Sequence, residues 1–411
     1  MLSMNRPELL APAGDAERLA AAVEYGADAV YLGSDRFGMR TAAASFGGDE
    51  LRNACDYAHS KGVKVYLTCN TVPRNNELAE LPSFIEYAAE SGVDAFIITD
   101  IGVLKLAKKY APDVDIHIST QAGITNYAAA NAFYELGANR IVTARELSLA
   151  EIAELRAKTP KELEIECFVH GAMCMAYSGR CLLSAYLTGR DANRGACAQP
   201  CRWKYRIVEP SRPDRPLTAE EDETGTYLFN ADDLCMIDHL PALSRAGVRS
   251  LKIEGRAKAA YYVAVIANAY RAAADGWAAS GYAADYRLAP WISAEVNKVS
   301  HRPYGTGFYF GPPGQNTASG GYIREFEVAA VAEEWAGGLQ RFSQRNRFTV
   351  GDECSVLEPG RPPFSLTVRE MFGPDGEPLT AAPHPTMSVW IPLSRPLVPG
   401  SLLRRPVCGG A

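Results

Sequence analysis

Short runs of apolar, often β-branched residues alternate with longer alanine-rich stretches through the first 260 residues of the chain. The runs have the length of β-strands, and the stretches between them repeat apolar residues at helical spacing. Many stretches end on a glycine that the next run follows at once, as glycine does when it caps the C-terminus of a helix. The eight runs are Glu8–Ala11, Ala29–Gly33, Val63–Asn70, Asp94–Asp100, Asp115–Gln121, Arg140–Glu146, Leu163–Gly171 and Ser250–Glu254.

Strand–helix alternation repeated eight times predicts an α/β fold, a parallel (β/α)8 TIM-type barrel, which we place at residues 1–285. A doubly wound open sheet is the structural alternative. A cysteine-rich insertion at about residues 172–249 separates the seventh strand from the eighth. It contains two further candidate strands, Lys204–Val208 and Thr226–Asn230, and the proline- and acid-rich stretch between them is predicted to be a loop.

The composition changes beyond residue 285, because 15 of the 26 prolines lie between Pro290 and Pro406. Short runs of alternating apolar and polar residues replace the helical stretches, and this pattern predicts a small antiparallel β-barrel domain. We expect a linker at residues 286–323 and the second domain at residues 324–411. Its expected strands are Glu325–Ala332, Arg347–Leu357, Ser365–Phe372 and Thr386–Leu393.

Composition and charge narrow the possible function classes. The chain has 411 residues, of which 47% are hydrophobic and 22% charged, and its formal net charge is −6. No window approaches the ~18 apolar residues of a membrane-spanning helix, and the first residues lack the pattern of a secretion signal. We therefore expect a cytoplasmic protein with no membrane partner. The negative net charge argues against a protein that coats nucleic acid through bulk charge.

Six of the ten cysteines lie within residues 167–235. Four of them form a C-x6-C-x15-C-x3-C series, which can supply four thiolates to zinc or to an iron–sulfur cluster. Structural zinc usually sits between two closely spaced pairs, whereas only the second pair is close here, so the spacing favours a [4Fe–4S] cluster and leaves zinc as the alternative. The predicted ligands are Cys174, Cys181, Cys197 and Cys201, with Cys235 as an alternative ligand.

The residues around the first of these cysteines resemble a known family. Residues 166–174 read ECFVHGAMC and residues 179–184 read GRCLLS, which match the signature of the collagenase-like peptidases of unassigned catalytic type, family U-32. Residues 7–14 (PELLAPAG) and 250–256 (SLKIEGR) are also similar to that family. The resemblance extends over most of the chain, including its C-terminal part.

Despite the family's name, the resemblance implies RNA modification. The family includes bacterial proteins that hydroxylate the wobble uridine of tRNA and a relative that hydroxylates a ribosomal RNA cytidine. Several members carry a four-cysteine [4Fe–4S] cluster, and the RNA-modifying ones depend on prephenate as oxygen donor. The resemblance thus implies prephenate-dependent 5-hydroxylation of the wobble uridine, with the anticodon loop of tRNA as partner and with a possible homo-oligomer or a hetero-oligomer with a paralogue.

A barrel of this type places its chemistry at the C-terminal ends of its strands. Arginine forks there would suit the carboxylates of a dianionic donor, whereas Asn70 and Asp100 could instead cap the following helices. The candidate substrate-binding residues are Asn70, Gln121, Arg145, Glu146 and Arg256, and the candidate catalytic residues are His170, Tyr177 and Glu254.

Basic residues interleaved with aromatic ones follow the first two candidate ligands. Such a mixture suits phosphate contact combined with base stacking, although a solvated hairpin face is the alternative. The candidate RNA-binding residues are Arg180, Arg190, Arg194, Arg202, Trp203 and Lys204.

A peptidase is the second functional hypothesis. His170 with Ser184, or His117 with Ser119, would have to supply base and nucleophile. The chain has no H-E-x-x-H zinc motif, and a thiolate bound to a cluster is unavailable as a nucleophile. A non-catalytic RNA-binding or partner subunit is the third hypothesis.

Overall fold

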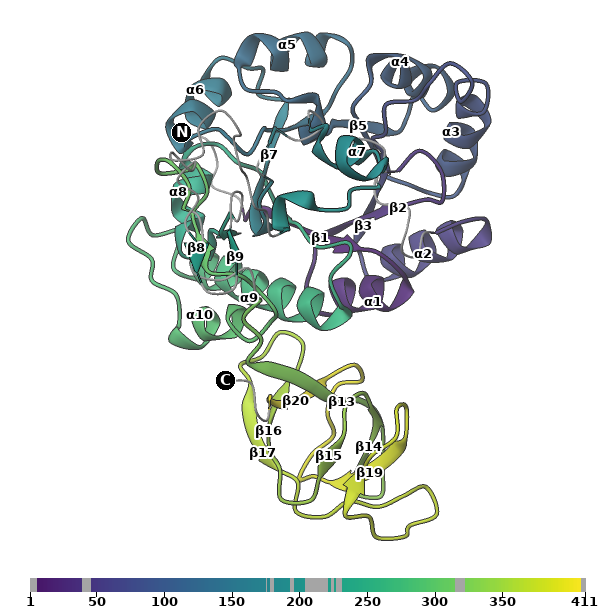
Figure 1. Ribbon diagram of the computed structural model, residues 1–411, viewed down its shortest axis with the longest axis vertical. Helices are drawn as coiled ribbons and strands as arrows, with labels where there is room; N and C mark the ends of the chain where they lie inside the picture. Colours follow the sequence, from purple (N-terminus) through teal and green to yellow (C-terminus); the bar gives the residue numbers. More distant parts are fainter. Residues whose placement is uncertain are drawn as a thin grey trace.

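The computed structural model shows two domains, a barrel surrounded by helices and a smaller all-β domain (Figure 1). It describes residues 6–38, 46–174, 176–177, 181–192, 196–203, 221–222, 225–226, 231–314 and 322–407. None of the helices in these ranges is long and apolar enough to cross a membrane.

Eight parallel strands close into a barrel, as the alternation of apolar runs predicts. Each strand pairs with the next in sequence, and the last one, β11, pairs with both β7 and β1, which excludes the open sheet. The barrel strands are β1 (Glu8–Ala13), β2 (Ala29–Gly33), β3 (Lys64–Cys69), β4 (Ala95–Ile98), β5 (Asp115–Ile118), β6 (Arg140–Val142), β7 (Glu164–Ala172) and β11 (Ser250–Ile253).

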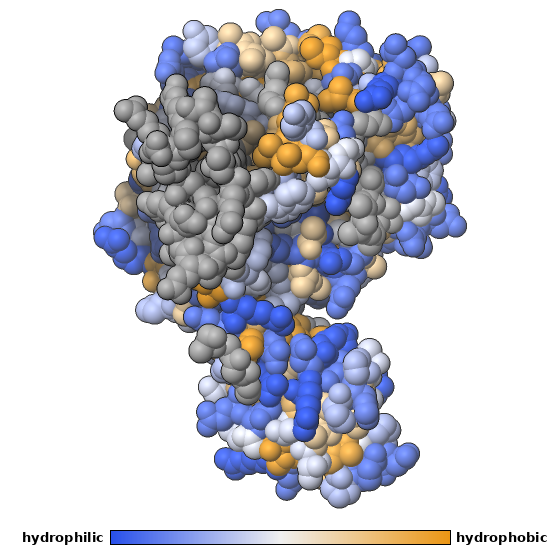
Figure 2. All heavy atoms as spheres, viewed as in Figure 1, coloured by the Kyte–Doolittle hydropathy of each residue, from blue (hydrophilic) through white to orange (hydrophobic). Residues whose placement is uncertain are grey.

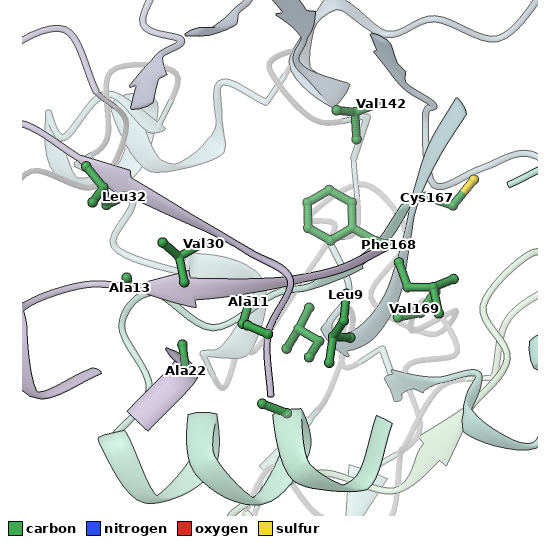
Figure 3. Packing of buried hydrophobic residues seen from close by; sticks show 14 of the residues in the cluster. Leu9, Ala11, Ala13, Ala22, Val30, Leu32, Val142, Cys167, Phe168 and Val169 are labelled. Atoms are coloured by element: carbon green, nitrogen blue, oxygen red, sulfur yellow. The ribbon is translucent and has the colours of Figure 1, made fainter. Parts of the chain in front are cut away.

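Helices surround the barrel and cover its outer face. Alternate residues of the strands, such as Leu9, Val30 and Val169, point outward and pack against them (Figure 3). Asp100 caps α4 by accepting a hydrogen bond from the Val103 N–H, which confirms the capping interpretation. The helices are α1 (Ala16–Glu24), α2 (Asp49–Ser60), α3 (Leu81–Glu90), α4 (Ile101–Tyr110), η1 (Thr120–Ala122), α5 (Tyr127–Glu135), α6 (Leu149–Ala157), η4 (Ile237–His239), α8 (Leu240–Arg245) and α9 (Ala260–Ala279).

The insertion leaves the C-terminal end of β7 and returns beside it. It contains α7 (Leu183–Thr188), η3 (Pro200–Arg202), β8 (Glu221–Asp222) and β9 (Gly225–Thr226). It then forms β10 (Asp233–Cys235), which pairs antiparallel with the end of β7. The candidate strand at residues 204–208 lies outside the described residues, as does most of the one at residues 226–230. The sequence patterns did not indicate β10.

The C-terminal domain is an antiparallel half-barrel. Its six-stranded sheet has the order β17-β16-β20-β13-β14-β19, and a two-stranded sheet pairs β15 with β18. Each of the four expected strand regions contains a strand, whereas β14, β18 and β20 were not expected. The strands are β13 (Phe326–Ala336), β14 (Leu339–Gln344), β15 (Phe348–Thr349), β16 (Glu353–Leu357), β17 (Phe364–Thr367), β18 (Ala381–Ala382), β19 (Ser388–Pro392) and β20 (Leu402–Pro406).

Residues 286–323, expected as a linker, contain regular structure that packs on the barrel. The helix α10 (Pro290–Val296) buries Ile292 and Val296 in the barrel's core, and β12 (Tyr304–Gly305) pairs with β10. Arg302 is fully buried and forms an ion pair of 2.5 Å with Asp233. This segment is therefore part of the scaffold that holds the insertion against the barrel.

Candidate active site at the barrel mouth

A buried network of charges fills the lower part of the barrel. Arg140 forms ion pairs with Glu8 at 2.6 Å and with Glu166 at 3.0 Å. Glu166 also accepts a 2.7 Å hydrogen bond from the Lys252 ammonium. Burial lowers the pKa of Lys252, while the nearby Glu166 carboxylate opposes this effect. Since these groups satisfy one another away from solvent, we interpret the network as the floor of the site.

Two aromatic rings, those of Tyr31 and Phe168, lie above this floor. The Lys252 ammonium is 4.7 Å from the centre of the Tyr31 ring and 5.4 Å from that of Phe168. The Arg145 guanidinium lies over the same Phe168 ring at 3.8 Å, and that of Arg256 lies 6.0 Å from the Tyr31 ring. The rings thus hold two further cations at the mouth by cation–π contact.

The mouth contains the predicted arginine and glutamate side chains. Arg145 donates a 2.7 Å hydrogen bond to the Ala172 carbonyl and a 3.3 Å hydrogen bond to the Glu254 carboxylate. Its Nε atom is buried and has no hydrogen-bond partner among the described residues. Arg256 donates a 3.0 Å hydrogen bond to the Thr68 hydroxyl. The two guanidinium groups are therefore held in place by protein contacts before any ligand binds.

Asn70 follows β3 and Gln121 follows β5, and Thr99, after the intervening strand β4, contacts both. The Thr99 hydroxyl is 3.2 Å from the Asn70 carbonyl and 3.4 Å from the Gln121 side-chain oxygen. The next helix, α3, begins only at Leu81, so Asn70 is not its cap. Glu146 is half-buried, and burial raises its pKa. These positions add hydrogen-bonding groups to the rim near the two arginines.

His170 lies outside this mouth. It is 1% exposed on the outer side of β7, and its ring nitrogens are 3.4 Å from the Tyr270 hydroxyl and 3.3 Å from the Tyr304 hydroxyl. Burial lowers its pKa to about 3, so the imidazole is neutral. The register between β7 and β11 shifts between Lys252 and Ile253, and this irregularity turns His170 toward α9. Strand alternation alone would have directed it inward. Tyr177, in contrast, is 49% exposed in the insertion.

The two serine–histidine pairs considered for a peptidase do not form in the described part of the chain. His117 is buried against the Tyr66 ring at 4.6 Å, whereas Ser119 caps η1. Ser184 is fully buried, and its hydroxyl accepts a 2.9 Å hydrogen bond from the Ala198 N–H. The geometry therefore provides no nucleophile with an adjacent base at either pair.

The four predicted ligand cysteines are more exposed than the cysteines of the domain cores. Cys174 and Cys197 are exposed and Cys181 and Cys201 are half-buried, whereas four other cysteines are buried in the domain cores: Cys55, Cys69, Cys167 and Cys354. The Cys197 sulfur accepts a 3.3 Å hydrogen bond from the Gln199 N–H, a contact that stabilises a metal-bound thiolate. In the described ranges, no three His, Cys, Asp or Glu side chains are close enough together to hold a metal. The donor chemistry of the segment fits a thiolate-bound metal or cluster.

Cys235, the alternative ligand, lies at the end of β10. It lies opposite His170 in the β7–β10 pairing, and burial raises its pKa to about 11. Cys174 lies two residues beyond the end of β7, and Cys235 is half-buried, as Cys181 and Cys201 are. Cys201 as the fourth ligand, with Cys235 as the alternative, stays a prediction.

The structure places only part of the predicted RNA-binding set. Trp203 is 42% exposed and Arg190 is exposed beside α7. Arg180, Arg194 and Lys204 and the side chain of Arg202 lie outside the described residues.

Sequence patterns missed Tyr31 and Thr68, which support Arg256 from neighbouring strands. Each lies two residues after an inward-facing position, Ala29 and Tyr66 respectively. Strict alternation along β2 and β3 was the signal that could have identified both residues.

Comparisons with known proteins agree with this architecture. Residues 14–319 match the model of Peptidase family U32, and residues 324–404 match that of the Peptidase family U32 C-terminal domain. The chain is 36% identical to the tRNA hydroxylation protein P of Escherichia coli, over 96% of this chain and 95% of that protein. It is 34% identical to the tRNA hydroxylation protein P1 of Bacillus subtilis, over 98% of this chain and 95% of that protein.

A relative with a different name also matches. The Collagenase of Porphyromonas gingivalis is 34% identical to this chain, over 75% of each protein. Since the two family models match in order and together span nearly the whole chain, the protein belongs to peptidase family U32.

Proposed function

We propose that this protein is an RNA-hydroxylating enzyme that converts the wobble uridine of tRNA to 5-hydroxyuridine. The observation that carries this proposal is the similarity to proteins named for tRNA hydroxylation, which extends over at least 96% of this chain. The aligned region includes both the barrel mouth and the cysteine segment. The mouth itself offers cationic groups and hydrogen-bonding groups, but neither serine–histidine pair of a peptidase.

The two arginines of the mouth suit an oxygen donor with two carboxylates, and we propose prephenate in this role. Arg145 is oriented by the Ala172 carbonyl and the Glu254 carboxylate, and Arg256 by the Thr68 hydroxyl. A guanidinium held in this way loses little side-chain entropy when it binds a carboxylate. Glu254 would orient the donor indirectly, because its carboxylate holds Arg145. Its negative charge would also repel any anionic group beyond the donor's two carboxylates.

Cys174, Cys181, Cys197 and Cys201 would hold a [4Fe–4S] cluster. A cluster bound there would supply electron transfer close to the mouth, and zinc bound by the same thiolates would have only a structural role. The Gln199 N–H would remain hydrogen-bonded to the Cys197 sulfur in either case. Iron and sulfide analysis of protein purified without oxygen, together with its absorbance spectrum, distinguishes the two metals.

Mass spectrometry of tRNA nucleosides tests the proposed activity. A strain that lacks this gene and any paralogue should lose 5-hydroxyuridine and its derivatives, and the wild-type gene should restore them. Cys174→Ala should fail to restore them, whereas Cys354→Ala, which alters a buried cysteine of the C-terminal domain, should succeed. Unchanged 5-hydroxyuridine in the deletion strain would refute the proposal.

Proteolysis is the second candidate function, because a relative named Collagenase is 34% identical to this chain. Digestion of collagen or casein by the purified protein tests it. Cleavage that persists in Cys174→Ala and Cys197→Ala would favour a peptidase, provided that a substitution elsewhere in the chain abolishes it.

A further inference from the structure

The short helix α7 exposes its large apolar side chains and buries its small polar one. Leu182, at the N-cap, is 71% exposed and Tyr186 is 87% exposed, whereas Ser184 is fully buried. Residues four positions apart share one face of a helical turn, so Leu182 and Tyr186 form one outward surface. Helices at the surface of globular proteins normally have the opposite arrangement, and an apolar face turned to solvent marks an interaction site.

Hydrogen bonds hold α7 in this orientation. The buried Ser184 hydroxyl accepts the Ala198 N–H at 2.9 Å, which ties the helix to the segment of Cys197. The Thr188 hydroxyl donates to the Ser184 carbonyl at 2.7 Å and accepts the Arg190 N–H at 3.2 Å. The Thr188 bonds close the last turn of the helix, whereas turning the apolar face inward would break the bond between Ser184 and Ala198. The exposure of Leu182 and Tyr186 is therefore tied to that contact.

Other exposed apolar side chains belong to the same insertion. Figure 2 shows apolar side chains at the surface where α7 lies in front of the barrel strands in Figure 1. We name the exposed apolar residues of α7 and of the adjoining η3 segment the α7 platform, and its members are Leu182, Tyr186, Leu187 (42%) and Trp203 (42%). Two of the four members are aromatic. Aromatic side chains provide flat surfaces on which unpaired bases stack.

The charge of the surrounding sequence identifies the kind of partner. Residues 177–206 contain six basic residues and one acidic residue, a net charge of +5, within a chain whose net charge is −6. Two copies of this segment would carry the same excess of positive charge, which disfavours self-association through it. A polyanion that also carries exposed flat rings, namely a single-stranded RNA loop, complements both the charge and the aromatic surface.

We propose that the α7 platform stacks the unpaired bases next to the target uridine, with Leu182 and Tyr186 in contact with the loop. The inference rests on the proposed function, because that function supplies the RNA loop. Stacking on the platform would replace the stacking that the flanking bases lose when the uridine enters the barrel mouth. Arg190, which is exposed beside α7, would contact the phosphates.

Binding of a labelled anticodon stem-loop RNA to the full-length protein, followed by fluorescence anisotropy, tests this proposal. Tyr186→Ala and Leu182→Ser should each raise the dissociation constant, by about tenfold for the tyrosine, whereas Tyr186→Phe should bind as the wild type does. Tyr127→Ala is the matched control, since it removes a 39%-exposed tyrosine of α5. The salt dependence of binding should stay unchanged in Tyr186→Ala and weaken by about one unit of slope in Arg190→Ala.

Wild-type RNA affinity in both Tyr186→Ala and Leu182→Ser would overturn the proposal. A dimer that Tyr186→Ala dissociates in sedimentation, with RNA affinity unchanged, would also overturn it and would assign the platform to a second copy. These results leave the proposed function intact if 5-hydroxyuridine still depends on the gene. If RNA binding requires Tyr186 but 5-hydroxyuridine does not depend on the gene, the platform stands and the proposed function fails.

Discussion

Arg145 and Glu254 show how single residues gain their position from strand geometry. Each follows the end of a barrel strand, and alternate side chains of a strand point inward. The pair consequently meets at the mouth with a hydrogen bond of 3.3 Å, as their positions at strand ends in the sequence suggested. His170 also belongs to a barrel strand, but a local irregularity in register directs it outward. Role assignments based on alternation therefore hold only where the register is regular.

Replacing Arg145 by lysine tests its proposed contact with a carboxylate. Lysine keeps the positive charge but loses the planar fork and the contact with the Phe168 ring, so we expect the kcat/KM for the donor to fall by roughly 10- to 100-fold. Arg36→Lys, at an exposed ion pair, is the control and should leave the kcat/KM unchanged. Equal kcat/KM values for Arg145→Lys and wild type would contradict a carboxylate-binding role.

The buried His117 predicts a pH dependence of stability. Burial, with Arg140 and Lys252 nearby, lowers its pKa well below the usual 6.5. In the unfolded chain the imidazole takes up a proton as the pH falls below about 6.5, whereas the folded protein cannot accommodate that proton. The stabilisation is therefore complete above pH 6.5 and declines as the pH is lowered. In His117→Gln the free energy of unfolding should decline less steeply as the pH is lowered, by up to about 1.4 kcal/mol per pH unit. Urea unfolding between pH 7 and pH 4 measures this difference.

If the free energy of unfolding of the wild type and of His117→Gln fell with equal slopes as the pH is lowered, this account of His117 would be contradicted. His59→Gln is the control, because His59 is 41% exposed at its side chain. It should change the decline less than His117→Gln does.

At the scale of elements, the long runs were predicted well and the short strands were not. All eight barrel strands fall on expected runs, since burial on both faces of a parallel sheet requires continuous apolar sequence. The three-residue strand β10 and the central strand β20 have no such pattern: β20 begins with two leucines and ends with two arginines and a proline. Their pairing depends on partners distant in sequence.

Gly171, near the end of β7, lies close to the backbone of Glu254, which follows β11. Its φ is +107°, and a Cβ atom there would lie 2.6 Å from the Glu254 carbonyl oxygen. Gly171→Ala should therefore reduce the free energy of unfolding by more than about 2 kcal/mol, because backbone strain and a backbone clash combine. Urea unfolding measures this change.

Gly189→Ala provides the matched control. Gly189 has a φ of +70°, and a Cβ atom there would have no neighbour within 4 Å. Gly189→Ala should therefore lower the free energy of unfolding by only about 1 kcal/mol, through backbone strain alone. Equal losses in the two variants would show that the contact with Glu254 has no energetic effect.

At the scale of the whole molecule, buried polar contacts join the two domains. Arg404 of β20 is fully buried and donates a 2.8 Å hydrogen bond to Glu295 of α10. The Tyr25 hydroxyl of α1's C-cap lies 3.1 Å from the Leu357 carbonyl and 3.0 Å from that of Gly400. The C-terminal domain is thereby fixed against the barrel at α1 and α10.

Breaking the Glu295–Arg404 pair should weaken this junction. Glu295→Gln leaves the Arg404 charge buried without its counter-ion, and we expect a loss of about 3 to 5 kcal/mol in the free energy of unfolding. Calorimetry should show the C-terminal domain unfolding at a lower temperature than the barrel. Glu154→Gln, at a solvent-exposed pair with Lys158, should leave the calorimetric transition unchanged. A single unshifted transition in Glu295→Gln would contradict a role for the pair in the junction.

Local patterns in the sequence were enough to predict the barrel and the all-β second domain and to reveal the cysteine series, because each depends on a local period or a local spacing. It also predicted which residues follow the ends of the strands. Contacts between distant segments decided that Arg145 meets Glu254, that His170 faces α9 and that Cys235 lies opposite His170 in the β7–β10 pairing. The outward face of α7 likewise depends on hydrogen bonds to a segment that follows it in the chain. These features depend on register and on contacts between distant segments, which no local pattern records.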